Sequence, residues 1–264
     1  MSRIRNPAFA GTFYPADAVE LRQVVEKLLA ETPESAKSDA TPKALIAPHA
    51  GYIYSGQVSA SAYARLLPVR SVIRRVVLVG PAHRVPVHGL ALPAVTEFAT
   101  PIGSVTIDQE AIAMVSDLPQ VCVFNDAHTQ EHSLEVHLPF LQLALDSFQL
   151  VPLVVGDASA EDVAEVLEKL WGGDETLIVI SSDLSHYHDY QTAREMDRAT
   201  SKAIERLAFK DIRRDQACGR TPVCGLLLVA RRKGMHSQTI DLRNSGDTAG
   251  PRDQVVGYGA YVIH

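Results

Sequence analysis

Three short apolar runs in this chain each lead into a polar turn, and this repeated pattern limits how the chain can fold. The runs read "ALIAPH" (44–49), "VVLVGPAH" (76–83) and "LIVISSDLSH" (177–186). Such runs predict buried strands, and Pro and Gly favour their ends. If the three strands are parallel neighbours, His49, His83, Asp183 and His186 converge where open α/β sheets bind ligands, beyond the carboxyl ends of the strands.

Predicted helices separate these strands. They cover residues 17–31, 132–145, 159–171, 190–208 and 221–234. The alternation predicts an α/β fold, with a central mostly parallel or mixed sheet and helices on both faces. Hydrophobic residues make up 46% of the chain and charged residues 21%, which is enough to build a sizeable core. Nothing divides the chain, so residues 1–264 are expected to form a single domain.

Charge and cysteine content exclude several classes of function. The net charge is −6, from 25 basic and 31 acidic residues, and no basic run stands out, so neither nucleic acid nor a membrane is an expected partner. No apolar run approaches a membrane span, and the first 17 residues lack the apolar region of a signal peptide. Three cysteines cannot all pair, which favours reduced thiols and a cytoplasmic location.

The cysteines are predicted to differ in role. Cys218 precedes a Gly-Arg turn and the start of a helix, and Arg220 is close in sequence, so a thiolate is expected to be favoured there. Cys224 lies within the apolar helix that follows, and Cys122 lies in the predicted strand "QVCVFN". Both are expected to be small core residues.

A thiolate near two imidazoles suggests a metal site. His49, His83 and Cys218 would suit iron, copper or zinc rather than magnesium or calcium, with a position left open for water or substrate. His186 is then free to act as an acid or base, and Asp183 to orient it or contact substrate. Taken singly, a strand-end histidine is more often a structural or surface residue, and the argument rests on the coincidence of three such strand ends.

The stretch "HTQEHSLEVH" (128–137) holds a second cluster. His128 and His132 are four residues apart, but Glu131 precedes His132, so the H-E-x-x-H arrangement of metalloproteases is absent. A supporting or substrate-contacting role is preferred for His132 and Glu135 over a role as metal ligands. His137 is expected on the surface, as are three further histidines: His188, His236 and His264.

Two tyrosines follow His49 closely. Tyr52 and Tyr54 either line the pocket or pack in the core, and the sequence favours neither alternative.

Six motifs occur in an order that resembles the Memo family: "NPAFAGTFYPAD", "APHAGYIYSG", "GPAHR", "EHSLEVHLPFLQ", "SSDLSHY" and "CGRTP". The resemblance spans nearly the whole chain. It implies the fold of the class III (LigB-type) extradiol dioxygenases, which have non-haem iron sites. It also implies a pocket lined by His49, His83, Asp183, His186 and Cys218.

The resemblance gives expectations about activity and partners. LigB-type enzymes bind iron through two His and a carboxylate, and Cys218 in the third place shifts the preference towards softer metals. Iron is expected first, with copper or zinc as alternatives. Bacterial and archaeal relatives are often encoded with a radical-SAM protein and an AMMECR-type protein, which implies a shared pathway.

Three functions remain open at this point. The first is a metal-dependent redox enzyme that acts on a small substrate, with aromatic compounds among the candidates. The second is a non-enzymatic binding protein that uses the same pocket for a peptide or partner. The third is a zinc-dependent hydrolase.

Overall fold

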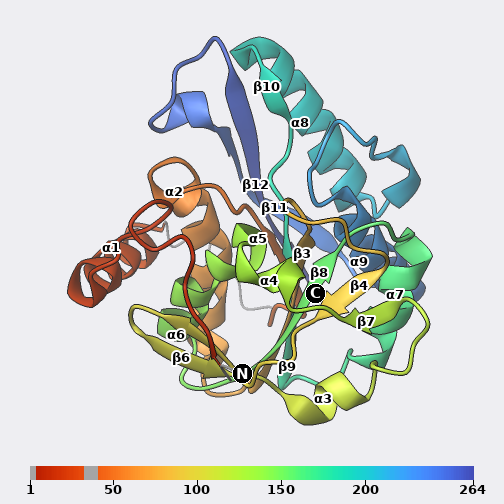
Figure 1. Cartoon of the computed structure of the whole chain (residues 1–264). Coiled ribbons are helices and arrows are strands. Elements are labelled where there is room, and N and C mark those ends of the chain that lie inside the picture. The colour runs from red at the N-terminus through yellow and green to blue at the C-terminus, as the bar shows by residue number, and fades with distance from the viewer. Residues whose placement is uncertain (1–3, 33–40) are drawn as a thin grey trace.

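A mixed nine-stranded sheet forms the centre of the molecule (Figure 1). The computed structural model describes residues 4–32 and 41–264. The strands follow the order β10 (His186–His188), β12 (Val255–Ile263), β2 (Ala44–Ala47), β9 (Thr176–Ser181), β3 (Arg75–Pro81), β8 (Gln149–Val155), β4 (Leu90–Leu92) and β7 (Val121–Val123), and β11 (Ser237–Asn244) also pairs with β12. A smaller sheet contains β1 (Ile4–Arg5), β5 (Glu97–Thr100) and β6 (Gly103–Thr106).

The central strands of the large sheet are parallel. β9 lies between β2 and β3, with Ser181 opposite Ala47 and Ile180 opposite Val79. β3 in turn pairs in parallel with β8, whereas β12 and β4 run antiparallel to their inner neighbours. The prediction that the three histidine-bearing runs are parallel neighbours is therefore confirmed.

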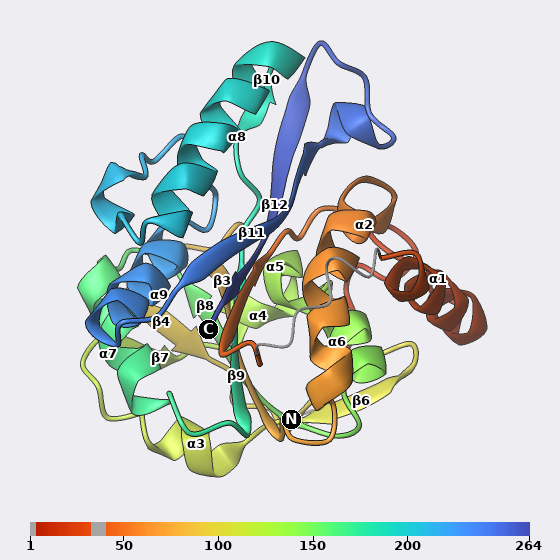
Figure 2. The same ribbon diagram turned by 180° about the vertical axis from the view of Figure 1, so that it is seen from behind.

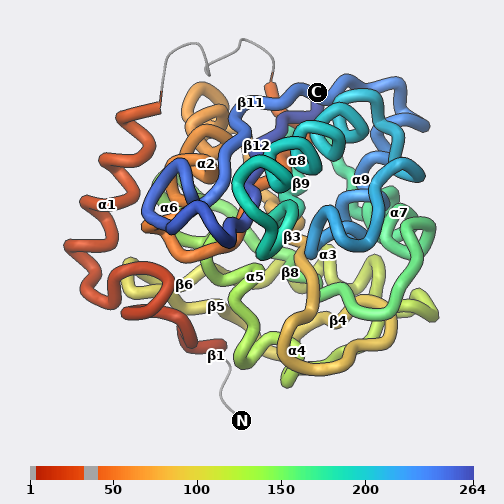
Figure 3. The backbone as a smooth tube through the Cα atoms, turned by 90° about the horizontal axis from the view of Figure 1, so that it is seen from above, coloured from red at the N-terminus to blue at the C-terminus, as the bar shows by residue number. Residues whose placement is uncertain are grey.

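Helices cover both faces of this sheet, as the views from the front, from behind and from above agree (Figures 1, 2 and 3). One face carries α1 (Ala18–Ala30), α2 (Tyr52–Tyr63), α5 (His132–Glu135) and α6 (Leu138–Ala144). The other carries α3 (Gln109–Ala113), α7 (Ala160–Lys169), α8 (Tyr190–Glu205) and α9 (Arg220–Arg232). The remaining helical segments are α4 (Asp126–Thr129), η2 (Ala64–Val69), η3 (Phe209–Asp211) and η4 (Ser245–Asp247).

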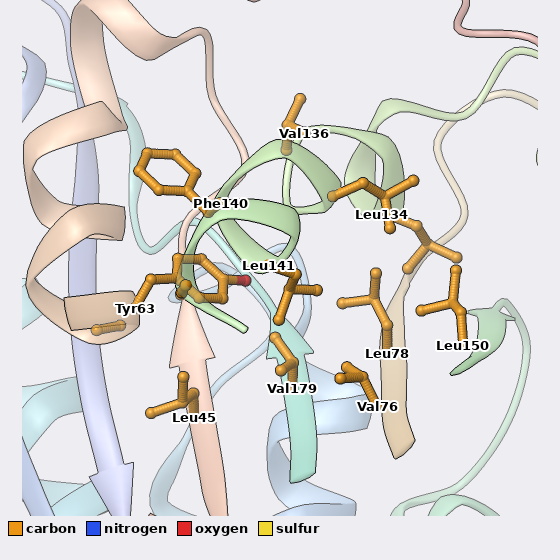
Figure 4. Packing of buried hydrophobic residues seen from close by; sticks show 14 of the residues in the cluster. Leu45, Tyr63, Val76, Leu78, Leu134, Val136, Phe140, Leu141, Leu150 and Val179 are labelled. Atoms are coloured by element: carbon orange, nitrogen blue, oxygen red, sulfur yellow. The ribbon is translucent and has the colours of Figure 1, made fainter. Parts of the chain in front are cut away.

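The period of two along each strand divides the apolar residues between two core layers. In β2, Leu45 joins the layer under α5 and α6, while Ile46 joins the layer under α7 and α9. Figure 4 shows the first layer, in which Leu45, Val179 and Leu78 rise from adjacent strands towards Leu141 of α6. The sheet is thus buried on both sides, which fixes its register and the position of its carboxyl edge.

Several predictions about local structure need correction. The predicted helix 132–145 is two helices, and Pro139 lies in the first turn of the second. Strand β11 was not predicted at all. Cys122 is exposed rather than in the core, and His137 is buried rather than on the surface.

Within the described part of the chain, no helix has both the length and the apolar character that crossing a bilayer requires.

Candidate metal centre at the carboxyl edge of the sheet

Three histidines bring one ligand atom each within 4.8 Å of one another, a group that could hold a metal ion. His49 and His83 each come two residues after the end of a central strand, β2 and β3. His132 is the first residue of α5. The ring centroids of His83 and His132 lie 4.6 Å apart in a stacked arrangement, and His49 meets both rings edge-on, at 5.1 and 5.3 Å.

A glycine explains how α5 reaches the end of β3. A Cβ atom on Gly80 would lie 2.9 Å from the Leu134 side chain and 3.0 Å from Oγ of Ser133, so a larger residue would push α5 away from the strand. Ser133 Oγ donates a hydrogen bond to the Pro81 carbonyl (2.8 Å), which fixes the contact. His132 is therefore held beside His83 although it follows no strand.

The ring of His49 is fixed by a serine chain. Ser181 Oγ donates to the Ser133 carbonyl at 2.5 Å, so it accepts from Nδ1–H of His49 at 2.6 Å. This tautomer leaves Nε2 of His49 with a free lone pair, the form that binds a metal. Burial, together with the nearby His83 and His132, lowers the pKa of His49 well below its usual range, so the ring is neutral at pH 7.

The ring of His83 is fixed by a carboxylate. Glu131 accepts from Nδ1 of His83 at 2.9 Å and from the His83 backbone N–H at 2.6 Å, which leaves Nε2 free. Burial alone would raise the pKa of Glu131, but hydrogen bonds from His83 and from the Ser133 amide outweigh burial and lower it to about 2. A carboxylate behind a histidine is a common support for a metal ligand.

The ring of His132 is held differently. Its Nδ1 is buried and, among the described residues, has no hydrogen-bond partner, although Oε1 of Glu131 lies 3.3 Å away. Phe13 and Phe9 pack against the ring, with centroid distances of 4.9 and 5.3 Å. Burial first, and then His83, lowers the pKa of His132 to about 4, so this third imidazole is also neutral at pH 7.

Cys218 lies beside the cluster, with Sγ 3.3 Å from Nε2 of His49. The place predicted for it among three ligands is taken by His132 in the group that the structure assembles. The expected thiolate is not favoured: burial, followed by Asp183, raises the pKa of the Cys218 thiol. Arg220 does not offset this, since its side chain donates to the Ile212 carbonyl at 2.6 Å. A ligand role for Cys218 stays a prediction.

Asp183 follows β9 by two residues and joins the same edge. Its Oδ1 accepts from the backbone N–H of His49 at 2.7 Å, and its backbone N–H donates to Sγ of Cys218 at 3.3 Å. Burial raises the pKa of Asp183 to about 7, against the opposing effect of the His49 hydrogen bond. Asp183 thus ties the segment that carries His49 to the one that carries Cys218.

His186 stands near the cluster but outside it. Its Nδ1 donates to the Leu184 carbonyl at 2.8 Å, which leaves Nε2 unprotonated. Burial lowers the pKa of His186 against the opposing effect of the Leu184 hydrogen bond, and the proximity of His83 lowers it further. Tyr187, the next residue, is 71% exposed and has a left-handed backbone (φ 61°), which aims its ring outward.

The three remaining predicted residues have separate places. Tyr52 is a core residue, because its ring is buried against Phe140 and its hydroxyl donates to the Val136 carbonyl at 2.7 Å. Tyr54 is 38% exposed. Glu135 is fully buried and accepts four hydrogen bonds from residues 5–14.

Sequence reasoning missed the two residues that orient the histidines. Ser181 is the last residue of β9 and points to the same edge as Asp183, so its position in the strand was a signal. Glu131 was considered only as evidence against a metalloprotease motif. Its position next to His132 carried no hint that it binds His83, which is 48 residues away.

The donor set fits a divalent transition metal. Three imidazoles suit zinc, copper, iron or nickel, and two of them have their second nitrogen engaged in a hydrogen bond, as is usual for metal-bound histidines. The fit suggests a divalent metal and leaves its identity open.

A sheet of this order, with donor side chains at the carboxyl edge of its parallel strands, is consistent with the fold of the LigB-type extradiol dioxygenases. In fold alone, the chain is similar to the crystal structure of the uncharacterized protein JW3007 from Escherichia coli K12. The TM-score is 0.51 at 14% identity, and the match covers 84% of this chain and 100% of that one.

The chain belongs to the Memo family. A family profile described as "Memo-like protein" matches residues 5–262. MEMO1 family proteins of Aquifex aeolicus, Sulfolobus acidocaldarius and Methanopyrus kandleri are 36%, 33% and 35% identical to it. Each match covers 97% or 98% of this chain and the same share of the relative. The resemblance noted from six motifs is confirmed.

Proposed function

We propose that the protein is a metal-dependent redox enzyme that acts on a small substrate at the carboxyl edge of its sheet. The observation that carries the proposal is the convergence of three imidazoles, each with one ligand atom within 4.8 Å of the others. Iron held by His49, His83 and His132 is the first choice of metal, with copper as the alternative. Bound iron(II) would supply Lewis acidity towards a substrate hydroxyl and an electron for dioxygen chemistry.

His186 is the proposed base of this enzyme. Its hydrogen bond to Leu184 presents an unprotonated Nε2, and its lowered pKa keeps that nitrogen basic but uncharged at pH 7. It can therefore accept the proton of a phenolic substrate hydroxyl. Asp183 holds the backbone of His49 in place, and its proposed role is to orient the site.

The test is elemental analysis of anaerobically purified protein, followed by oxygen uptake with catechol-type compounds. Wild-type protein is expected to contain a stoichiometric transition metal, and His49→Ala to lose it. His236→Ala is the control, because His236 is exposed and its backbone pairs with His264, far from the site in sequence. Metal retained in the His49→Ala protein would contradict the proposed centre.

A zinc-dependent hydrolase is the second candidate, and one observation favours it. The third donor in the cluster is an imidazole and not a carboxylate, and a set of three histidines with an open position is a known form of catalytic zinc site. Zinc in the purified protein, together with hydrolysis that continues when oxygen is removed, would support this alternative over the redox enzyme.

A further inference from the structure

His132 is the one histidine of the cluster without a hydrogen bond that fixes its ring. His49 and His83 are oriented by Ser181 and Glu131, whereas Nδ1 of His132 has no hydrogen-bond partner within the described residues, although Oε1 of Glu131 lies 3.3 Å away. The terminal torsion of a histidine is broad, so such a ring can rotate unless packing prevents it. On one side it stacks on His83 at 4.6 Å, and on the other it meets Phe13 at 4.9 Å.

Phe13 belongs to a segment, residues 5–14, that we call the N-terminal strap. The strap is fastened to α5 by Glu135, three residues after His132. Glu135 Oε1 accepts from the Phe9 amide (2.8 Å) and the Tyr14 hydroxyl (2.5 Å). Its Oε2 accepts from Nη1 of Arg5 (2.5 Å) and the Ala8 amide (2.9 Å). Because Glu135 is fully buried, these contacts are shielded from solvent and fix the strap against the helix.

The strap also contacts the segments that carry the other two histidines. The Phe13 carbonyl accepts from the Tyr52 amide at 2.8 Å, just after His49 in the sequence. The guanidinium of Arg84, the neighbour of His83, lies 5.5 Å from the centre of the Phe9 ring. One short segment thus touches all three ligand-bearing regions of the chain.

We propose that the N-terminal strap is the positioning element of the metal centre, and that Phe13 and Phe9 align His132 by restricting rotation of its ring. This inference rests on the proposed metal site. A ring already held in the binding orientation loses less conformational freedom when it coordinates a metal. Phe13 acts through His132 and does not touch the metal, so it is a positioning residue.

The test is Co(II) binding by Phe13→Ala, with Phe209→Ala as the matched control. Both phenylalanines are partly buried, but Phe209 packs in the core layer on the opposite face of the sheet. Phe13→Ala is expected to weaken Co(II) binding by roughly tenfold, the lower end of what loss of a supporting group costs a metal site. Phe209→Ala should leave the affinity unchanged, and Phe13→Tyr, which keeps a ring, should restore it.

Equal Co(II) affinity in wild type, Phe13→Ala and Phe209→Ala would overturn the strap proposal and leave the metal site standing. Wild-type protein that binds no Co(II) would contradict the metal site itself. In that case amide hydrogen exchange of metal-free protein decides the role of the strap. Faster exchange at residues 131–136 in Phe13→Ala than in Phe209→Ala supports positioning, and identical exchange in the two variants rules it out.

Discussion

Oε1 of Glu131 lies 2.9 Å from Nδ1 of His83, and the same glutamate directly precedes His132 in the chain. One residue therefore orients one candidate ligand and delivers another. It also begins α5, since its side chain accepts from the Ser133 amide at 2.9 Å. The carboxylate couples the end of β3 to the start of α5, and the geometry of the histidine cluster depends on that coupling.

Replacing Glu131 with Gln is expected to weaken metal binding by roughly 10- to 100-fold. The carboxylate accepts the His83 backbone N–H at Oε2 and Nδ1–H at Oε1, and in the amide one of these two oxygens becomes an NH2 donor. Competition titration with a chromogenic chelator measures the change. Glu168→Gln is the control, because Glu168 forms an exposed ion pair with Arg232. An unchanged affinity in Glu131→Gln would show that His83 needs no carboxylate.

Two single variants distinguish between His132 and Cys218 as the third ligand of the metal. His132→Ala is expected to lose bound metal, because it removes one of the three clustered donors. Cys218→Ser should keep the metal, since the thiol is protonated and donates to the Asp183 carbonyl at 3.6 Å rather than forming part of that group. Metal analysis of both proteins after anaerobic purification makes the comparison. The opposite result, metal lost from the serine variant and kept in the alanine variant, would make Cys218 the ligand.

Alkylation should label the three cysteines in the order of their exposure. Cys122 is exposed and is expected to react first, whereas burial raises the pKa of both Cys218 and Cys224 and slows them. This order replaces the expectation from sequence that a thiolate is favoured at Cys218. Peptide mapping by mass spectrometry after brief treatment with iodoacetamide reads all three sites. Modification of Cys218 before Cys122 would mean that the thiolate is stabilised after all.

The free energy of unfolding should decrease as the pH is lowered, and protonation of His137 is one cause. This buried ring pairs with the Tyr63 hydroxyl at 2.7 Å, and burial lowers its pKa to about 3. Below pH 6.5 His137 is protonated in the unfolded chain, whereas in the folded protein it stays neutral down to about pH 3. Lowering the pH therefore stabilises the unfolded chain relative to the folded protein. Between pH 7 and pH 5, His137 alone lowers the free energy of unfolding by about 2 kcal/mol.

His137→Asn keeps an acceptor for the Tyr63 hydroxyl and should flatten that dependence. Urea unfolding at pH 7 and pH 5 measures the difference between the two proteins. His128 has a pKa of about 4 and contributes a similar loss in both, so some slope remains in the variant. Parallel curves for the two proteins would show that His137 does not resist protonation.

The strands and two of the three clustered histidines could be predicted from the sequence, because local features determine their positions. An apolar run ends at a fixed edge of the sheet, so the residues that come after it are placed with it. His49, His83 and Asp183 each lie two residues beyond their strands. Period and position were sufficient for these three, and the α/β class followed from the same alternation.

The positions of His132 and Glu131 could not be predicted in the same way, because tertiary contacts determine them. Helix α5 has only four residues, and it reaches the end of β3 because Gly80 leaves room for it. The sequence of residues 128–137 alone does not indicate the contact with Gly80. The direction of the shift in the pKa of Cys218 also depends on packing. The proximity of Arg220 in sequence suggested a thiolate, but the Arg220 guanidinium donates to the Ile212 carbonyl.

The pairing of β2 has a consequence for how the chain reaches its native state. Ile46 lies opposite Ile180 on one side and Tyr261 on the other, so both neighbours of β2 come from much later in the chain. Contacts of such long sequence separation form slowly, because a large loop must close before any pairing is gained. During synthesis β2 leaves the ribosome with both of its edges unpaired. His49, which follows β2, is therefore among the first site residues to be synthesised. Its strand can pair on both edges only after nearly the whole chain has been made.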